Sequence, residues 1–170
     1  KLEVTKTAVG INTSLSGMDQ ATGYGLRVED REISLNVPDV ARVIGVFEST
    51  NTNVPTLDRL TFPSGLNLDT TAILGEKIIG DSSDAVAQIT GLISSTEVEI
   101  VYLTPTKFTT GEVCNFNESN ISTLLQLITV GNNLDITNRF QLDKGQREQF
   151  YDYSRLVRRA NFPPATRKVL

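Results

Sequence analysis

Hydrophobic and polar residues alternate over short stretches through most of this 170-residue chain. Residues 31–37 and 96–104 place every second side chain on one apolar face, which predicts half-buried β-strands. Residues 40–49 are apolar at successive positions, which predicts a central strand covered on both faces. Residues 84–93 fit either a strand or a helical turn. Turn-forming residues recur roughly every eight to twelve positions without a long helical period, so the pattern predicts an all-β fold, a small barrel or a sandwich.

One part of this pattern occurs twice, at an offset of 36 positions. Each copy has a Gly-Glu pair, an apolar residue, a polar turn with Ser and then an alternating strand. We interpret the two copies as one β-hairpin used twice within a small β-domain. The glycine would permit a positive φ or a bulge where the strand begins. The matching positions are Gly75-Glu76 with Gly111-Glu112, Ser83 with Ser119, and Ile89 with Leu125.

The predicted strands divide the chain into three segments. Residues 1–30 are rich in Gly, Ser, Thr and Asn, and we expect an N-terminal arm or loop there. Residues 31–135 form the β-rich domain. Residues 136–170 are a basic, aromatic segment whose two prolines favour extended backbone, and we expect it to lead to a further module. Because the chain starts at Lys1, we expect a piece of a longer polypeptide or a processed product.

Composition narrows the possible chemistry. The chain has no histidine and one cysteine. A Ser-His-Asp or Cys-His catalytic arrangement, an internal disulfide and a cysteine-based metal cluster are therefore excluded for this chain. Cys114 lies between apolar neighbours, and we expect it to be a small buried side chain. No apolar run approaches the roughly 18 residues of a membrane-spanning helix.

Without histidine, acid–base chemistry would depend on carboxylates. Asp81 and Asp84 flank a sequence typical of a turn. Glu97 and Glu99 share one face of a predicted strand whose other face is apolar, so we expect them to point to solvent rather than across a catalytic cleft. We therefore predict no enzymatic activity, no cofactor and no bound metal.

Positive charge is concentrated at the end of the chain. Residues 138–170 contain eight Lys or Arg and three Asp or Glu, a local charge of +5 in a chain of net charge −4. The aromatic residues among them would suit stacking on nucleic acid, but the acidic remainder would repel a polyanion. We expect pairing with acidic groups of the same chain first, a protein interface second, and no nucleic acid. Residues 145–157 fit a helix or a strand. The candidate interface residues are Arg147, Arg155, Arg158 and Arg159.

This basic segment resembles one found in very large virion structural proteins of tailed phages. Their pattern runs Ile-Thr, a basic residue, an aromatic residue, two more residues, Asp-Asn-Gly-Gln-Arg, two or three residues, and then aromatic-Tyr-Asp. Lys144 stands where Asn is more usual. Residues 33–49 and the hairpin beginning at Gly75 are also similar to parts of phage tail modules. The matching residues are Ile136, Thr137, Arg139, Phe140, Asp143, Gly145, Gln146, Arg147, Phe150, Tyr151 and Asp152.

The resemblance implies a β-rich structural module of a tail, baseplate or fibre, repeated along a long polypeptide and without catalytic residues. We expect such a chain to lie in the virion tail, to contact other virion proteins and to form a homo-oligomer, without a membrane partner. Two alternatives remain. One is a carbohydrate-binding module of a tail fibre that recognises a host-surface glycan, and the other is a polysaccharide-degrading enzyme that works without histidine.

Overall fold

The computed structural model describes residues 28, 30–147 and 150–170, and they form two compact units. The inserted unit comprises residues 57–131, and the flanking unit comprises the described parts of residues 1–56 and 132–170. Strands dominate both units, which confirms the all-β prediction. The predicted N-terminal arm lies almost wholly outside the described residues.

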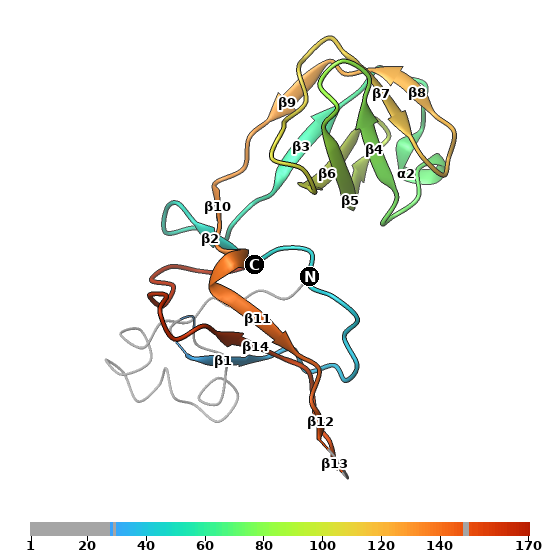
Figure 1. Ribbon diagram of the computed structural model, residues 1–170. Coiled ribbons are helices and arrows are strands. Elements are labelled where there is room, and N and C mark those ends of the chain that lie inside the picture. Colours follow the sequence, from blue (N-terminus) through green and yellow to red (C-terminus); the bar gives the residue numbers. More distant parts are fainter. Residues whose placement is uncertain (1–27, 29, 148–149) are drawn as a thin grey trace. The chain divides into compact units, whose positions relative to one another are not determined.

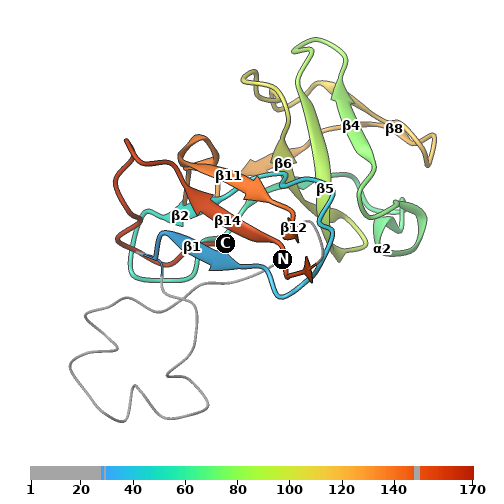
Figure 2. The same ribbon diagram turned by 60° about the horizontal axis from the view of Figure 1, so that its bottom comes forward.

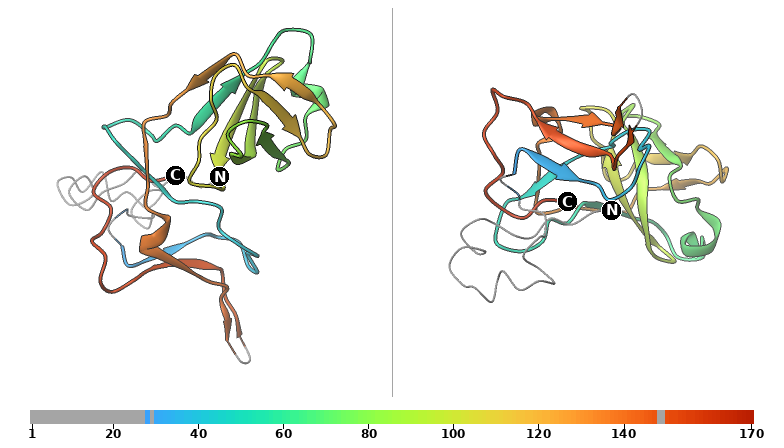
Figure 3. Two further views of the ribbon diagram at one scale, coloured as in Figure 1. Left: turned by 45° about the horizontal axis from the view of Figure 1, so that its top comes forward. Right: turned by 90° about the horizontal axis from the view of Figure 1, so that it is seen from below.

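The inserted unit is a curled antiparallel sheet of seven strands, in the order β8-β7-β4-β5-β6-β3-β9 (Figures 1 and 3). Its two outermost strands, β8 and β9, are separated by only two residues of chain. Between them, Leu125 donates its N–H to the Glu112 carbonyl and Gln126 donates to the Thr61 carbonyl. The chain thus passes from one end of the strand order to the other, giving a half-barrel. The elements are β3 (Asp58–Thr61), α2 (Leu68–Thr71), β4 (Lys77–Gly80), β5 (Val86–Ser94), β6 (Glu97–Tyr102), β7 (Val113–Phe116), β8 (Ser122–Leu124) and β9 (Leu127–Thr129).

Inward-facing side chains of these strands form the core of the inserted unit. Val98 and Ile100 are buried as their alternation predicts, and Tyr102 packs against them. Cys114 is fully buried, which confirms its predicted place. Phe62 adds an edge-to-face contact within this core. Each such aliphatic side chain contributes about 1.5–3 kcal/mol to folding through its removal from water.

Glu99 departs from the prediction that it points to solvent. Its side chain is buried and accepts a hydrogen bond from the Thr90 hydroxyl at 3.1 Å. It lies opposite Gly91 of β5, where no side chain competes for the space. The local burial therefore comes from the neighbouring strand and not from the alternation of β6 itself.

The predicted pseudo-repeat is present as two equivalent hairpins, β4 with the start of β5 and β7 with β8. β4 and β7 pair antiparallel with Ile79 opposite Asn115, two positions 36 residues apart. A local two-fold axis therefore passes between them. Gly75 has φ +94° and Gly111 has φ +92°, so both copies use the glycine for the same left-handed backbone.

The flanking unit contains a three-stranded antiparallel sheet in the order β1-β14-β11 (Figure 2). Two smaller pairings accompany it, β2 with β10 and β12 with β13, and the η2 turn precedes β11. Its core includes Ile33, Phe140 and Leu156, one from each strand of the three-stranded sheet. The bounds are β1 (Glu32–Ser34), β2 (Phe47–Ser49), β10 (Asn133–Asp135), η2 (Thr137–Arg139), β11 (Phe140–Asp143), β12 (Gln146–Arg147), β13 (Phe150–Tyr151) and β14 (Arg155–Arg158).

The flanking unit differs from the sequence-based expectation in two places. Residues 40–49 are not a central strand. Only Phe47–Ser49 forms a strand, β2, and the side chain of Ile44 is partly exposed. Residues 136–170 do not follow a separate β-rich domain, because β11 and β14 pair with each other and β14 also pairs with β1. Long-range strand pairing, which alternation does not encode, decides both points.

The described residues of the ambiguous segment 145–157 form strands and turns, and none of them is helical. Gly145 has φ +76°, and a Cβ there would lie 2.3 Å from the Asp152 carbonyl oxygen. Asp143 accepts the Gly145 N–H at 2.9 Å, and Asp152 donates its N–H to the Gly145 carbonyl at 3.0 Å. These contacts turn the chain from β11 into the β12–β13 pair and back into β14, which favours strands over a helix here (Figure 1).

Candidate functional site

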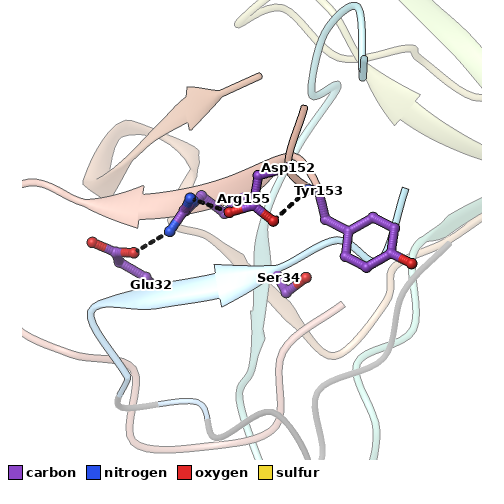
Figure 4. A pocket seen from close by; sticks show the side chains of 5 residues that line it. All are labelled: Glu32, Ser34, Asp152, Tyr153 and Arg155. Carbon is purple, nitrogen blue, oxygen red and sulfur yellow. Dashed lines mark hydrogen bonds and ion pairs between the residues drawn. The ribbon is translucent and has the colours of Figure 1, made fainter. Parts of the chain in front are cut away.

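Among the predicted interface residues whose side chains the structure describes, Arg155, at the start of β14, makes the most ion pairs. It lies opposite Ser34 of β1 and opposite Asp143 of β11. Its Nη1 is 2.9 Å from Glu32 Oε2, and its Nη2 is 2.7 Å from Asp152 Oδ2. Its Nε is 3.5 Å from Asp143 Oδ2. One guanidinium thus bridges three carboxylates that come from three segments of the chain. Figure 4 shows its contacts with Glu32 and Asp152.

A shallow hollow of about 220 Å³ lies beside this cluster. The hydrogen bond to Glu32, and then the charges of the neighbouring carboxylates, raise the pKa of Arg155 although partial burial opposes this. The guanidinium is therefore a permanent charge that the surrounding acids outnumber, and it is not free to bind a polyanion. The hollow is lined by Glu32, Ser34, Asp152, Tyr153 and Arg155 (Figure 4).

The other three predicted arginines do not join Arg155 in one patch. Arg158 lies three residues further along β14, so it projects to the opposite face, and its Nη1 donates to the Phe162 carbonyl at 2.7 Å. Arg159 follows the strand and is exposed. Arg147 belongs to β12, but its side chain lies outside the described residues. Arg155 therefore bears out the expectation of pairing within the chain, whereas Arg158 bonds to a carbonyl instead of a carboxylate.

Sequence reasoning missed a buried carboxylate that holds the C-terminal segment. Glu48 accepts the N–H of Thr166 at 2.6 Å and the N–H of Arg167 at 3.0 Å. It also pairs with Arg139 at 3.5 Å, and it is buried in the middle of β2. The sequence did contain a signal for this contact, because Glu48 is the one Glu within the apolar run of residues 40–49. A charge buried in such a run requires a partner, so a partner for Glu48 could have been predicted.

The second group of buried carboxylates links the two repeats of the inserted unit. Glu76, in the first repeat, accepts the N–H groups of Glu118 and Ser119 at 3.1 and 3.0 Å, and it accepts the Ser119 hydroxyl at 3.0 Å. All three donors lie in the turn of the second repeat. Glu76 also accepts the N–H of Ile73, three residues before it.

Glu112 makes the reciprocal set of contacts. It accepts the N–H of Ser83 at 3.1 Å and the Ser83 hydroxyl at 2.9 Å, both in the turn of the first repeat. Ser82 of the same turn also donates to it, and the N–H of Thr109, three residues before Glu112, completes the set. Each repeat therefore caps the turn of the other. We call these two glutamates the exchanged caps.

The electrostatics of the exchanged caps agree with a structural role. Burial alone would raise the pKa of Glu112, but hydrogen bonds from Thr109, Ser83 and Ser82 outweigh burial and hold the pKa below its ordinary value. The carboxylate is thus charged at neutral pH and satisfied by fixed donors. The predicted turn at Asp81 is confirmed as part of this capped turn. The 36-residue spacing identified the two glutamates, but not that each reaches into the other repeat.

Two further properties concern the part of the chain that the structure describes. It contains no cluster of three or more His, Cys, Asp or Glu side chains that could hold a metal ion. None of its helices is both long enough and apolar enough to cross a lipid bilayer. No model of a protein family, no curated protein and no solved structure matches this chain.

Proposed function

We propose that this chain is a structural module of a tailed-phage virion, in the tail, the baseplate or the fibre, and that it acts through assembly contacts with other virion proteins and with copies of itself. The resemblance of residues 136–152 and of the repeated hairpin to phage tail modules supports this role. So does the β-rich architecture of both units.

The observation that carries the proposal is how the chain uses its conspicuous polar side chains. Glu48, Glu76, Glu112 and Arg155 each bind several groups of neighbouring turns and strands. These contacts are internal and maintain the fold, as expected of a module whose role is structural. The surface is then available for contacts between chains.

Immunogold labelling of intact phage particles tests this role. Antibodies against the chain should label one place on the tail, and the same antibodies absorbed with the purified chain should label nothing. Label confined to tail, baseplate or fibre supports the proposal and identifies the component. Unlabelled particles, with the antigen free in solution, would reject it.

A second candidate function, binding of a host-surface glycan, is favoured by Tyr153. Its side chain is 55% exposed at the rim of the hollow, beside Ser34, Asp152 and Arg155 (Figure 4). An exposed aromatic face next to hydrogen-bonding groups suits a sugar ring. A glycan array should then retain the wild-type chain and lose the Tyr153→Ala variant, whereas no binding by the wild type would reject this function.

A further inference from the structure

The outer edge of β8 has backbone groups that point away from the sheet. The β7–β8 register pairs Cys114 with Thr123, and Phe116 donates its N–H to the carbonyl of Ile121. In an antiparallel pair, alternate residues bond to the partner strand. The N–H and C=O groups of Ser122 and Leu124 therefore face the other way. β8 ends the strand order, and no described residue bonds to those groups.

The first repeat shows the same position filled. By the 36-residue offset, Val86 and Gln88 of β5 correspond to Ser122 and Leu124 of β8. The Val86 carbonyl accepts the N–H of Leu103 at 2.7 Å, and Gln88 lies opposite Val101 of β6. A strand thus covers the edge in the first repeat and is missing in the second.

The sequence of β3 explains the missing strand. In the pairing of β3 with β9, Leu60 lies opposite Ile128. In the pairing of β6 with β5, Val98 lies opposite Leu92, which corresponds to Ile128 by the 36-residue offset. β3 therefore takes the place in the second repeat that β6 takes in the first. Continued with the same bulge that β5 has between Ile89 and Gly91, β3 would place Pro63 opposite Leu124. Proline has no N–H and is disfavoured within a sheet, and β3 ends before it, at Thr61. The chain then turns towards α2 and leaves the edge of β8 open.

Side chains along this edge differ from those of the first repeat. Leu124 is 48% exposed and lies opposite Val113, which is 36% exposed. The equivalent positions of the first repeat hold Gln88 and Lys77. The first repeat forms the same hairpin with polar residues at these positions. Folding of the hairpin therefore does not require Leu124 and Val113 to be aliphatic.

The absence of charge also distinguishes the β8 edge from the rest of the inserted unit. Residues 119–134 contain no charged residue, although the inserted unit has nine Asp and Glu against three Lys and Arg, a net charge of −6. Interface cores are depleted of charge, and native open edges are usually protected by charges such as lysine. The β8 edge is thus a neutral, apolar and unprotected site on an acidic unit.

We propose that the edge of β8 binds an extended strand of a partner protein, which adds to the sheet as β6 does in the first repeat. The partner strand is uncharged and apolar where it meets Leu124, in the manner of Ile100–Tyr102 in β6. Backbone hydrogen bonds to Ser122 and Leu124 supply the affinity, and contacts with Leu124 and Val113 supply the specificity. The inference rests on the proposed assembly role, and it names the surface and the class of partner for that role.

A fluorescent peptide with the sequence of residues 97–106 is the probe, because it includes the segment that fills the equivalent position. Added to the full chain, it should slow hydrogen exchange of the Ser122 and Leu124 amides while leaving the amide of Thr123, which already bonds to β7, unchanged. Fluorescence anisotropy then measures its affinity for the wild type and for variants.

Leu124→Pro is the discriminating variant. It removes an N–H that points outward and leaves the hydrogen bonds between β7 and β8 intact, so the unit should fold with Cys114 still protected from thiol reagents. Peptide binding should weaken by about tenfold or more. If proline unfolds the unit, Ser122→Lys replaces it, because a lysine on an exposed edge opposes strand addition without removing any backbone donor.

Absence of slowed exchange at Ser122 and Leu124, or equal affinity of the folded variant and the wild type, would overturn the inference. These outcomes are separate from those of the virion labelling. Labelled tails without strand addition would reject this site alone, and strand addition with unlabelled particles would reject the virion role alone.

Discussion

Removal of one exchanged cap should destabilise the inserted unit by a large fraction of its folding free energy. Glu112→Ala leaves the N–H groups of Thr109 and Ser83 without their acceptor, in a place where Glu112 itself is only 6% exposed. A hydrogen bond to a charged group contributes about 1.5–3 kcal/mol, and an unsatisfied buried donor costs about 1–3 kcal/mol. We therefore expect a loss of about 3–5 kcal/mol. A unit of this size has a stability of roughly 4–11 kcal/mol.

The single cysteine gives an assay specific to this unit. Cys114 is fully buried in the core of the inserted unit, so its reaction with a thiol reagent across a urea series reports the unfolding of that unit and not of the flanking one. Glu118→Ala is the matched control, because Glu118 lies in the capped turn but contributes only its backbone N–H to the cap. Its side chain is exposed, and we expect a change within about 0.5 kcal/mol.

Equivalence of the two repeats supplies a second check. Glu76→Ala should cost about as much as Glu112→Ala, because each glutamate accepts two N–H groups from the opposite turn, together with one hydroxyl at Glu76 and two at Glu112. A loss below about 1 kcal/mol for Glu112→Ala, or an equal loss for Glu118→Ala, would refute the stabilising role of the exchanged caps.

Three further predictions concern the same unit. Because the pKa of Glu112 is lowered on folding, its contribution to stability should be complete above the ordinary carboxyl pKa and should be lost as the pH falls through its folded value; urea titrations between neutral and acidic pH should show this loss, and Glu112→Gln should reduce it. Gly80→Ala places a Cβ 2.5 Å from both Glu112 Oε2 and Ser83 Oγ, so thermal unfolding should show a loss of about 1–3 kcal/mol that becomes much smaller in a Glu112→Ala background. Burial, and then the charge of Glu112, raises the pKa of Cys114 to about 12, so mass spectrometry after alkylation at pH 8 should find it unmodified in the folded chain and modified in urea; modification at the same rate in both would contradict its burial.

Much of the inserted unit was determined locally by the sequence. Alternation in residues 97–102 identified the buried face of β6, because successive side chains of a strand point to opposite sides wherever that strand pairs. The repeat at 36 residues identified the paired hairpins, because equal patterns of apolar, glycine and turn residues adopt equal backbone conformations. The basic residues near the end of the chain indicated pairing with acidic groups of the same chain, which Arg155 bears out.

Tertiary structure decided which faces and edges are covered and which groups exchange contacts. Glu99 is buried because Gly91 of another strand leaves space beside it. Within residues 40–49 only β2 pairs, with the three residues of β10 and with Val169. Glu76 and Glu112 cap each other's turns because the two-fold relation of β4 and β7 brings residues about 30 to 43 positions apart into contact. A sequence pattern records the preference of each residue and its near neighbours, whereas strand order and register arise from the whole chain at once, and they alone determine that β5 is covered by β6 while the edge of β8 stays open.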